Sequence, residues 1–356
     1  MNATRATSHT TGDAPAYVQA LLSRALDAGL TDLYLIPDRD GLDLSGRQAS
    51  GARVALDRLP APFGAQCVAR LKVLAGMLTY RTSTAQDGAI HGIDGHPHAE
   101  LRLATLPTCA GERVTVRIVQ GQARPPGLDD LGFAAPAVAA IRRLLQHPAG
   151  IVILTGPTGS GKTTTIYAMV RDLLARGHSP ATLITIEDPV ESALEGISQV
   201  ELRRDDPAWG YAEALRAVLR HDVKTLVIGE LRDREVTRVA LDAALTGHRV
   251  ITTYHAGDIG GVYARLLHQG FEPFQVAAAV TGVVAQRLLR GRADGAPVPV
   301  AAVLEADDAW REVVMAAPGL GDLRRRAGAV PGADLEAAAR DLAAAGRIDA
   351  KEAILL

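Results

Sequence analysis

The stretch Ile151-Val-Ile-Leu-Thr-Gly156-Pro-Thr-Gly-Ser-Gly-Lys162-Thr163 decides the fold of this chain. It matches the pattern G-x-x-x-x-G-K-[ST] and lies between an apolar run typical of a buried strand and a segment with helical spacing. Glycines allow consecutive backbone N–H groups to point inward around a phosphate, and the positive end of the following helix adds to that field. The sequence therefore predicts a phosphate-binding loop that holds a nucleoside triphosphate.

Each residue of this loop has an expected part. The Lys162 ammonium would reach the β- and γ-phosphates, and the Thr163 hydroxyl would bind Mg²⁺. ATP and Mg²⁺ are therefore the expected cofactors. The residues expected to contact the nucleotide are Gly156, Pro157, Thr158, Gly159, Ser160, Gly161, Lys162, Thr163 and Thr164.

Length and composition indicate a globular protein of about two domains. The chain has 356 residues, of which 47% are hydrophobic and 22% charged, as in ordinary globular proteins. Lys and Arg number 38 against 40 for Asp and Glu, a balance that does not favour a nucleic-acid binder. Cys67 and Cys109 lie far apart, which favours reduced thiols over a disulfide or a metal site. No run approaches the roughly 18 apolar residues of a membrane-spanning helix.

The chain outside the loop divides into segments of different pattern. Residues 1–13 are rich in Thr, Ser and Asn and predict a disordered lead-in, and residues 14–120 mix helical and alternating segments, as in a small α+β domain. Residues 121–129 include the Pro- and Gly-containing stretch 121–127 and predict a linker that acts as a hinge. Residues 130–290 alternate strand and helix, which predicts an α/β domain with a mostly parallel sheet and helices on both faces. Residues 291–356 are rich in Ala and Gly and predict a helical C-terminal region.

Within the α/β domain, short apolar runs predict strands buried on both faces. These runs lie at residues 151–154, 183–186, 225–228 and 250–253. Residues 274–289 are predicted to form one long helix.

Two acidic clusters follow predicted strands, at the edge where an open α/β sheet binds its ligand. The first is Glu187-Asp188-Pro-Val-Glu191, and the second contains Glu230. We assign Glu191 as the base that activates water and Glu230 to Mg²⁺ through a bound water, with the reverse assignment open. Glu187 and Asp188 are also expected near the metal, together with Thr163.

Two histidines, His248 and His255, flank one apolar strand. A sensor of the γ-phosphate or a contact between subunits is the functional interpretation, and a hydrogen-bonded polar residue at a strand end is the alternative. Metal binding has little support, because no cysteine or third histidine follows at a suitable spacing.

The order of these motifs resembles that of the secretion ATPases, the motors of type II secretion and type IV pilus assembly. The resemblance covers residues 14–290, and two segments are similar to the assembly branch more than to the retraction branch. The motifs that carry it are the phosphate loop, Glu-Asp-Pro-Val-Glu (187–191), Gly-Glu-Leu-Arg-Asp (229–233), Thr-Gly-His (246–248), His255, Gly-Phe-Glu-Pro-Phe (270–274) and Val-Val-Ala-Gln-Arg-Leu (283–288).

The resemblance implies a RecA-like ATPase core preceded by a small, PAS-like α+β domain. It further implies a cytoplasmic homo-hexamer that hydrolyses ATP to ADP and phosphate to power assembly of a type II secretion pseudopilus or a type IV pilus. An inner-membrane platform protein would be its partner and would hold it at the membrane, with no nucleic acid involved. The family's nucleotide-contacting arginines fall on Arg102 and Arg117, although solvated strand arginines are the alternative.

The chain also departs from the assembly branch. That branch carries a zinc module of four cysteines, whereas residues 290–300 contain no cysteine, so no zinc is expected. The large additional N-terminal domain of many assembly ATPases is expected to be missing. A pilus-retraction ATPase, a nucleic-acid-translocating motor and a non-hydrolysing nucleotide-gated regulator remain as alternatives.

Overall fold

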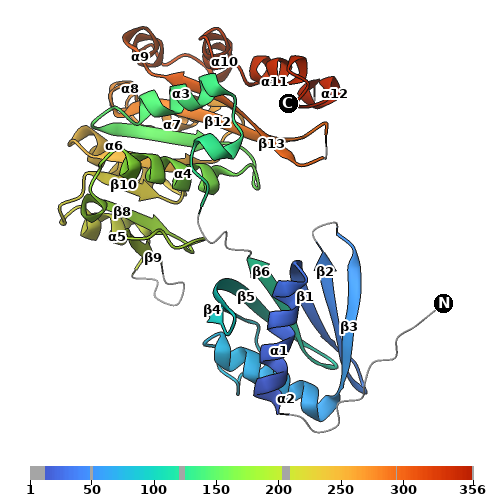
Figure 1. The fold of residues 1–356 in the computed structure, drawn as a ribbon. Coiled ribbons are helices and arrows are strands. Elements are labelled where there is room, and N and C mark those ends of the chain that lie inside the picture. The colour runs from blue at the N-terminus through green and yellow to red at the C-terminus, as the bar shows by residue number, and fades with distance from the viewer. Residues whose placement is uncertain (1–12, 49–50, 120–124, 203–208, 294, 355–356) are drawn as a thin grey trace. The chain divides into compact units, whose positions relative to one another are not determined.

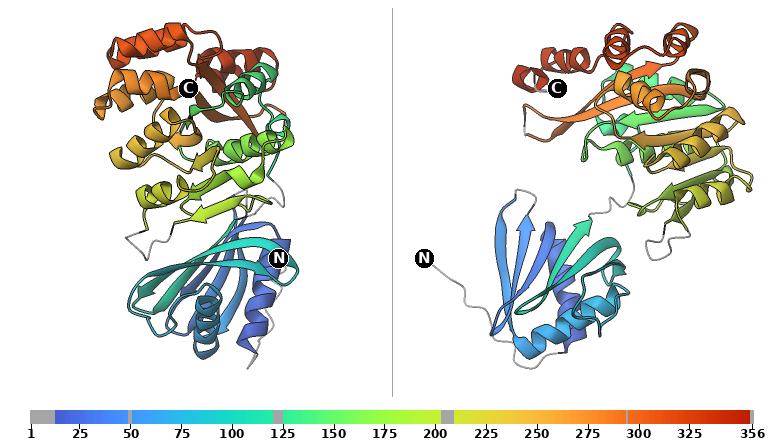
Figure 2. Two further views of the ribbon diagram at one scale, coloured as in Figure 1. Left: turned by 90° about the vertical axis from the view of Figure 1, so that its left-hand side faces the viewer. Right: turned by 180° about the vertical axis from the view of Figure 1, so that it is seen from behind.

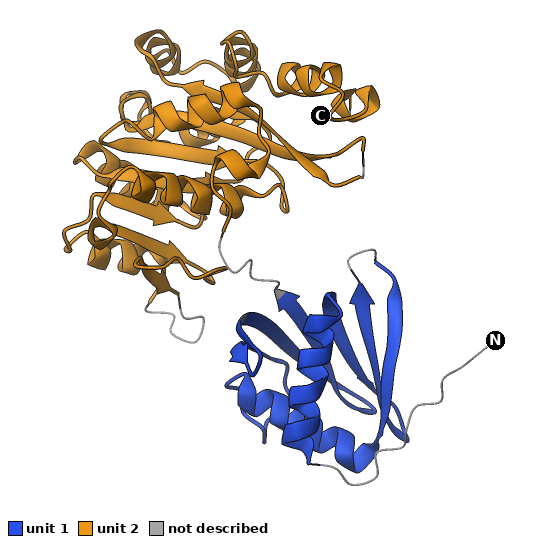
Figure 3. Ribbon diagram, viewed as in Figure 1, with its two compact units in different colours: residues 1–123 blue, residues 124–356 orange. Residues whose placement is uncertain are grey.

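The computed structural model describes residues 13–48, 51–119, 125–202, 209–293 and 295–354. The chain separates into two compact units, Met1–Ala123 and Arg124–Leu356 (Figure 3). The predicted lead-in lies outside the described residues except for Asp13, and so does the first half of the predicted linker.

The first unit is an antiparallel sheet with two helices (Figure 1). The order of its six strands is β3-β2-β1-β6-β5-β4. Apolar side chains of both helices, such as Leu22 and Leu71, form one core with strand residues such as Leu33 and Leu101. The elements are α1 (Ala14–Asp27), β1 (Leu30–Pro37), β2 (Gly41–Gln48), β3 (Arg53–Pro60), α2 (Ala61–Leu74), β4 (Gln86–Ile93), β5 (His96–Thr108) and β6 (Gly111–Val119).

The second unit contains a sheet of seven strands in the order β13-β12-β7-β11-β10-β8-β9. Neighbouring strands from β12 to β9 are parallel, and β13 pairs antiparallel to β12. The strands are β7 (Gly150–Thr155), β8 (Leu183–Glu187), β9 (Ser198–Glu201), β10 (Thr225–Ile228), β11 (Arg249–Tyr254), β12 (Val280–Arg290) and β13 (Pro297–Glu305).

Helices cover both faces of this sheet, as the views of Figure 2 show. The helices are α3 (Ala135–Leu144), α4 (Lys162–Ala175), α5 (Tyr211–Val218), α6 (Arg234–Leu245), α7 (Ile259–His268), α8 (Pro273–Ala279), α9 (Asp308–Met315), α10 (Leu320–Gly328), α11 (Leu335–Ala344) and α12 (Ala350–Ile354). Two short 3₁₀ turns lie at Asp129–Leu131 and Pro180–Thr182.

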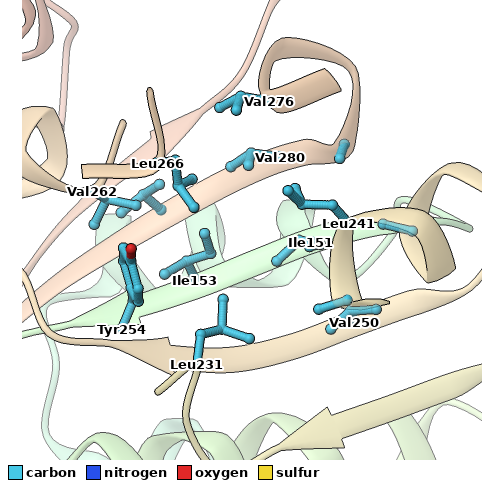
Figure 4. Close-up of a cluster of buried hydrophobic side chains, with 14 of the residues drawn as sticks. Ile151, Ile153, Leu231, Leu241, Val250, Tyr254, Val262, Leu266, Val276 and Val280 are labelled. Atoms are coloured by element: carbon cyan, nitrogen blue, oxygen red, sulfur yellow. The ribbon is translucent and has the colours of Figure 1, made fainter. Parts of the chain in front are cut away.

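The period of two along β7 divides the core between the two faces. Ile151 and Ile153 pack in a cluster with residues of α5 to α10 (Figure 4). Val152 and Leu154 point to the other face and pack with residues of α3 and α4. Because β7 is buried on both faces, the strand that leads into the phosphate loop is fixed by apolar packing on either side.

The prediction of one long helix over residues 274–289 is wrong. The structure has the short helix α8 (Pro273–Ala279), followed by β12 (Val280–Arg290), which lies between β7 and β13 in the sheet. Val280, Val283 and Val284 favour a strand, but the run is buried on both faces, so neither a period of two nor one of 3.6 shows in the sequence.

The predicted helical region after residue 290 begins with a strand. β13 (Pro297–Glu305) pairs with β12 from Arg290 to Gly282, so the sheet continues across residue 290. The helices α9 to α12 follow it. Within the described part of the chain, none of the helices has both the length and the apolar character needed to cross a membrane.

Candidate nucleotide-binding site

A cavity of about 540 Å³ lies at the carboxyl ends of β7, β8, β10 and β11. Open α/β sheets bind ligands at this edge, and the volume is within the range of about 300–1,000 Å³ of small-ligand sites. The lining residues are Thr158, Gly159, Gly161, Lys162, Thr163, Thr164, Glu187, Asp188, Pro189, Glu191, Tyr211, Gly229, Glu230, Thr253, His255 and Leu288. The structure thus brings the phosphate loop, both acidic clusters and His255 together in one cavity.

The backbone of the loop depends on its glycines, as Gly161 and Gly156 show. Gly161 is the N-cap of α4 and has a φ of 84°, in the left-handed region that favours glycine. Having no side chain, it leaves the first N–H groups of α4 open to an anion. At Gly156, a Cβ atom would lie 2.3 Å from the carbonyl oxygen of Gln286. The loop can therefore pack against β12 only with glycine at this position.

The side chain of Lys162 folds back onto the loop. Its Nζ donates hydrogen bonds to the carbonyl oxygens of Gly156 and Pro157, each at 2.9 Å. Burial, followed by the nearby positive charge of Arg287, lowers the pKa of Lys162, while Glu230 and Glu191 act in the opposite direction. A phosphate in the cavity would offer this ammonium charged acceptors, which form stronger hydrogen bonds than the carbonyls do.

Gln286 on β12 connects the loop to the sheet. Its Nε2 donates to the carbonyl oxygen of Ser160 at 2.6 Å, and its Oε1 accepts from the hydroxyl of Thr165 at 2.9 Å. The side chain of Gln286 is buried, so both hydrogen bonds are shielded from water. They join the loop and the first turn of α4 to β12, the strand next to β7 in the sheet.

The two acidic clusters meet at Arg232. Its Nη1 lies 2.7 Å from Oδ2 of Asp188, and its Nε donates to Oε1 of Glu230. The other carboxylate oxygen of Glu230 lies 3.0 Å from Nε2 of His255. Glu230 is thus held on both sides, and Asp188 is held beside it.

Glu187 is buried within the protein, although it also borders the cavity. Its carboxylate accepts hydrogen bonds from the hydroxyls of Tyr167 and Thr185, the latter at 2.7 Å, and from the amide of Gln199 at 3.0 Å. Three donors from inside the protein already use this carboxylate. The setting therefore favours a structural role for Glu187 over the predicted binding of metal.

This network also orders the first acidic cluster. The hydroxyl oxygen of Tyr167 accepts the backbone N–H groups of Glu191 at 3.2 Å and Ser192 at 3.3 Å. Burial, together with the charge of Glu187, raises the pKa of Tyr167, so the phenol stays protonated and donates to Glu187. The segment that carries Glu191 is therefore tied to α4, the helix that begins at the phosphate loop.

The donor atoms at the cavity suit Mg²⁺ bound together with a nucleotide. Among the residues that the structure describes, no group of three or more His, Cys, Asp and Glu could hold a metal ion by itself. Mg²⁺ does not require such a group, because it keeps several waters and binds through one or two carboxylates and the phosphates of a substrate. Thr163, Asp188 and Glu230 all line the cavity and supply the hydroxyl and carboxylate oxygens for this mode.

The two predicted histidines lie at opposite ends of β11. His255 follows the carboxyl end and lines the cavity. His248 precedes the amino end, where its Nδ1 lies 3.0 Å from the carbonyl oxygen of Ala243. The six residues of β11 separate the two histidines, and His248 is not among the residues that line the cavity. A contact with another subunit remains a prediction for His248.

Arg102 and Arg117 belong to the first unit and form a cross-strand pair on β5 and β6. Like charges directly opposite one another repel, and each arginine has a carboxylate partner. Nε of Arg102 donates to Glu100 at 2.8 Å, and Nε of Arg117 lies 3.3 Å from Oδ1 of Asp32. Their side chains are 35% and 68% exposed. Their contact with a nucleotide remains a prediction.

Sequence reasoning did not assign a role to Gln286, Arg232 or Tyr167. The sequence does hold a sign of the role of Gln286. It is the single amide in the apolar run 283–286, and a buried amide needs hydrogen-bond partners. Arg232 follows Glu230 by two residues, at the end of a predicted strand. The partners of Gln286 and Tyr167 are distant in sequence, so their pairing could not be read from spacing.

Comparison with known proteins shows the family to which this chain belongs. The model of the family "Type II/IV secretion system protein" matches residues 9–327. The type II secretion system protein HxcR of Pseudomonas aeruginosa is 38% identical over 304 residues, which are 83% of this chain and 61% of that protein. The type IV pilus assembly ATPase PilB of Thermus thermophilus is 34% identical over 276 residues, 77% of this chain and 30% of that protein. The chain thus spans less than two thirds of the length of these relatives.

A solved structure shows the same fold. The pilus retraction motor PilT with bound ADP superposes with a TM-score of 0.78 at 22% identity, covering 95% of this chain and 96% of that one. This likeness concerns the fold alone, because the identity is low. The match of the family model over most of the chain, together with relatives at 34–38% identity, shows that this chain belongs to the type II/IV secretion system protein family.

Proposed function

We propose that this chain hydrolyses ATP to ADP and phosphate at the cavity of its second unit. The observation that carries the proposal is the meeting of the phosphate loop with Asp188, Glu191 and Glu230 around one cavity. A loop for the phosphates explains binding, and carboxylates across from it supply the groups that hydrolysis needs.

In this proposal each residue of the cavity has a distinct role. Lys162 leaves its two carbonyl partners and holds the β- and γ-phosphates. Glu191 accepts a proton from the attacking water, and Glu230 orients water at the metal through a carboxylate that Arg232 and His255 already hold. Mg²⁺, when bound, neutralises charge on the phosphate oxygens. The acidic residues need to move little during the reaction. This preorganisation lowers the free energy of reaching the transition state.

We further propose that hydrolysis powers assembly of a type II secretion pseudopilus or a type IV pilus. The names of relatives at 34–38% identity support this role. The active form would be a cytoplasmic homo-hexamer, held at the inner membrane by a platform protein, in which Arg102 and Arg117 contact nucleotide. A retraction motor is the competing role, but the similarity to PilT is one of fold.

Phosphate release from ATP by the purified protein, measured with and without Mg²⁺, tests the catalytic proposal. We expect Mg²⁺-dependent turnover that Lys162→Ala abolishes together with most of the nucleotide affinity. Turnover that persists in Lys162→Ala would contradict the assignment of the site. Stimulation by single-stranded DNA that disappears at high salt would favour a nucleic-acid motor instead.

The mass of the protein in solution, measured with Mg²⁺ and a non-hydrolysable ATP analogue, tests the hexamer. A protein that stays monomeric under these conditions would contradict the ring and leave the nucleotide site unaffected. For the cellular role, deletion of the gene should abolish fibres or secretion, whereas accumulation of fibres would favour a retraction motor.

A further inference from the structure

Arg232 joins the two acidic segments of the cavity through one guanidinium group. It lies two residues after Glu230, beyond the carboxyl end of β10. One nitrogen, Nη1, contacts Asp188 at 2.7 Å, and another, Nε, contacts Glu230. A planar guanidinium presents several N–H groups in fixed directions, so it can set the orientation of two carboxylates at once.

The surroundings of Arg232 hold this arrangement in place. Its guanidinium carbon lies 5.4 Å from the centre of the ring of Tyr211, within the range of a cation–π contact. A Cβ atom at Gly229, directly after β10, would lie 2.9 Å from the hydroxyl of Tyr211, so the glycine leaves room for this ring. The arginine is therefore packed between an aromatic ring and two carboxylates.

We propose that Arg232 is a positioning residue that fixes Asp188 and Glu230 for catalysis and, by its charge, raises the Mg²⁺ concentration that the site requires. The inference rests on the proposed function and deepens it. Without a cation, the two carboxylates would repel each other. Arg232 supplies that cation before the nucleotide binds, and its positive charge then opposes a second cation near the same carboxylates.

This arrangement predicts that loss of the arginine tightens the binding of Mg²⁺ but slows turnover. Removal of the charge in Arg232→Gln should lower the half-saturating Mg²⁺ concentration by about threefold to tenfold, the size expected for one charge at a partly exposed site. The same variant should lose about 10-fold to 100-fold in kcat, because the carboxylates lose their fixed orientation. A side chain that only supports folding would not tighten the binding of Mg²⁺.

Arg232→Lys separates charge from geometry. An ammonium keeps the positive charge but cannot reproduce the fork that contacts both carboxylates. We expect a half-saturating Mg²⁺ concentration close to that of the wild type and a reduced kcat.

The experiment titrates Mg²⁺ into the full chain with a fluorescent, non-hydrolysable ATP analogue and measures ATP turnover in parallel. Arg216→Gln is the matched control. Arg216 also bridges two carboxylates, Glu213 at 2.7 Å and Glu235, and is 42% exposed against 46% for Arg232, but it lies outside the cavity lining. This control should match the wild type in both measurements.

An unchanged or higher Mg²⁺ requirement in Arg232→Gln would overturn the inference. If that variant does not fold, full turnover in Arg232→Lys would overturn it equally. Wild-type protein whose binding of the analogue does not respond to Mg²⁺ would contradict the proposed function itself and, with it, this inference.

Discussion

Gln286 holds Ser160 through a hydrogen bond of 2.6 Å from its side-chain amide to the backbone carbonyl oxygen. The bond joins β12 to the middle of the phosphate loop, although the two residues are 126 positions apart in the chain. The loop therefore has a support besides the conformational freedom of its glycines. A strand next to β7 carries a buried side chain that fixes the loop from the side.

Replacement of Gln286 by alanine should weaken nucleotide binding. The change removes the hydrogen bonds to Ser160 and Thr165, which contribute about 1 kcal/mol each, so we expect a loss of affinity of about tenfold or more. Gln286→Glu should lose more, because a carboxylate would face the carbonyl oxygen of Ser160. Equilibrium binding of fluorescent ADP measures both effects.

The control for this prediction is Gln275→Ala. Gln275 is a glutamine of the same unit that contacts Asp242 at the surface, at 3.1 Å. The Gln275→Ala variant should bind ADP as tightly as the wild type does. Unchanged affinity in Gln286→Ala would show that the loop is held without this residue.

Glutamine variants of Glu191 and Glu230 can decide which of the two is the base and which acts at the metal. If Glu191 is the base, Glu191→Gln should reduce kcat by about 10²-fold to 10⁴-fold and leave ATP binding intact. Glu230→Gln should raise the Mg²⁺ concentration needed for nucleotide binding, because it removes a negative charge near the metal. Turnover and Mg²⁺ titrations of both variants, compared side by side, decide between them. The opposite pattern would exchange the two assignments.

The sequence was sufficient to predict the phosphate loop because its chemistry is local. Gly156, Gly161 and Lys162 act through backbone conformation and short-range contacts within one continuous segment. The acidic clusters were also predictable, since parallel strands of one sheet end at the same edge. What brings them together there is the order of the sheet.

The parts that the sequence did not predict depend on contacts between distant segments. The sequence predicts one helix over residues 274–289, although most of this run forms β12 (Val280–Arg290). A run buried on both faces shows no periodicity, and only its pairing with β7 makes it a strand. The roles of Gln286 and Tyr167 follow from partners on other elements. Glu187 was expected at the metal, but its burial and its partners are properties of the fold and could not be read from its position after a strand.

Loss of the Tyr167 hydroxyl should disturb catalysis and stability together. In Tyr167→Phe, the carboxylate of Glu187 loses a donor, and the N–H groups of Glu191 and Ser192 lose their acceptor. A hydrogen bond to a charged group contributes about 1.5–3 kcal/mol, so we expect a decrease of that order in the free energy of unfolding. Denaturant titration measures it, and kcat should fall more than nucleotide affinity does. Tyr80→Phe, at an exposed tyrosine, is the control.

Asp32 should make the stability of the first unit depend on acid pH. Its side chain is 3% exposed and contacts Arg47 at 2.6 Å and Arg117 at 3.3 Å. Burial acts to raise the pKa of Asp32, but the hydrogen bonds from Arg47, Thr31 and Arg117 outweigh it and hold the pKa below its ordinary value. Since the folded state binds this proton less readily than the unfolded state, the carboxylate stabilises the fold above its unfolded pKa, near 4. That stabilisation is lost as the pH falls through the lower, folded value.

Asp32→Asn should therefore destabilise the protein at pH 7 by about 1.5–3 kcal/mol, the range for hydrogen bonds to a charged group, and progressively less below about pH 4. Denaturant unfolding of the full chain at a series of pH values, followed by a probe in the first unit, measures the difference. The matched control is Asp43→Asn, because Asp43 contacts Arg58 at 2.6 Å but is 56% exposed, and exposed ion pairs contribute little. A difference between Asp32→Asn and the wild type that stays constant from pH 7 to pH 3 would show that packing around residue 32, and not its charge, stabilises this sheet.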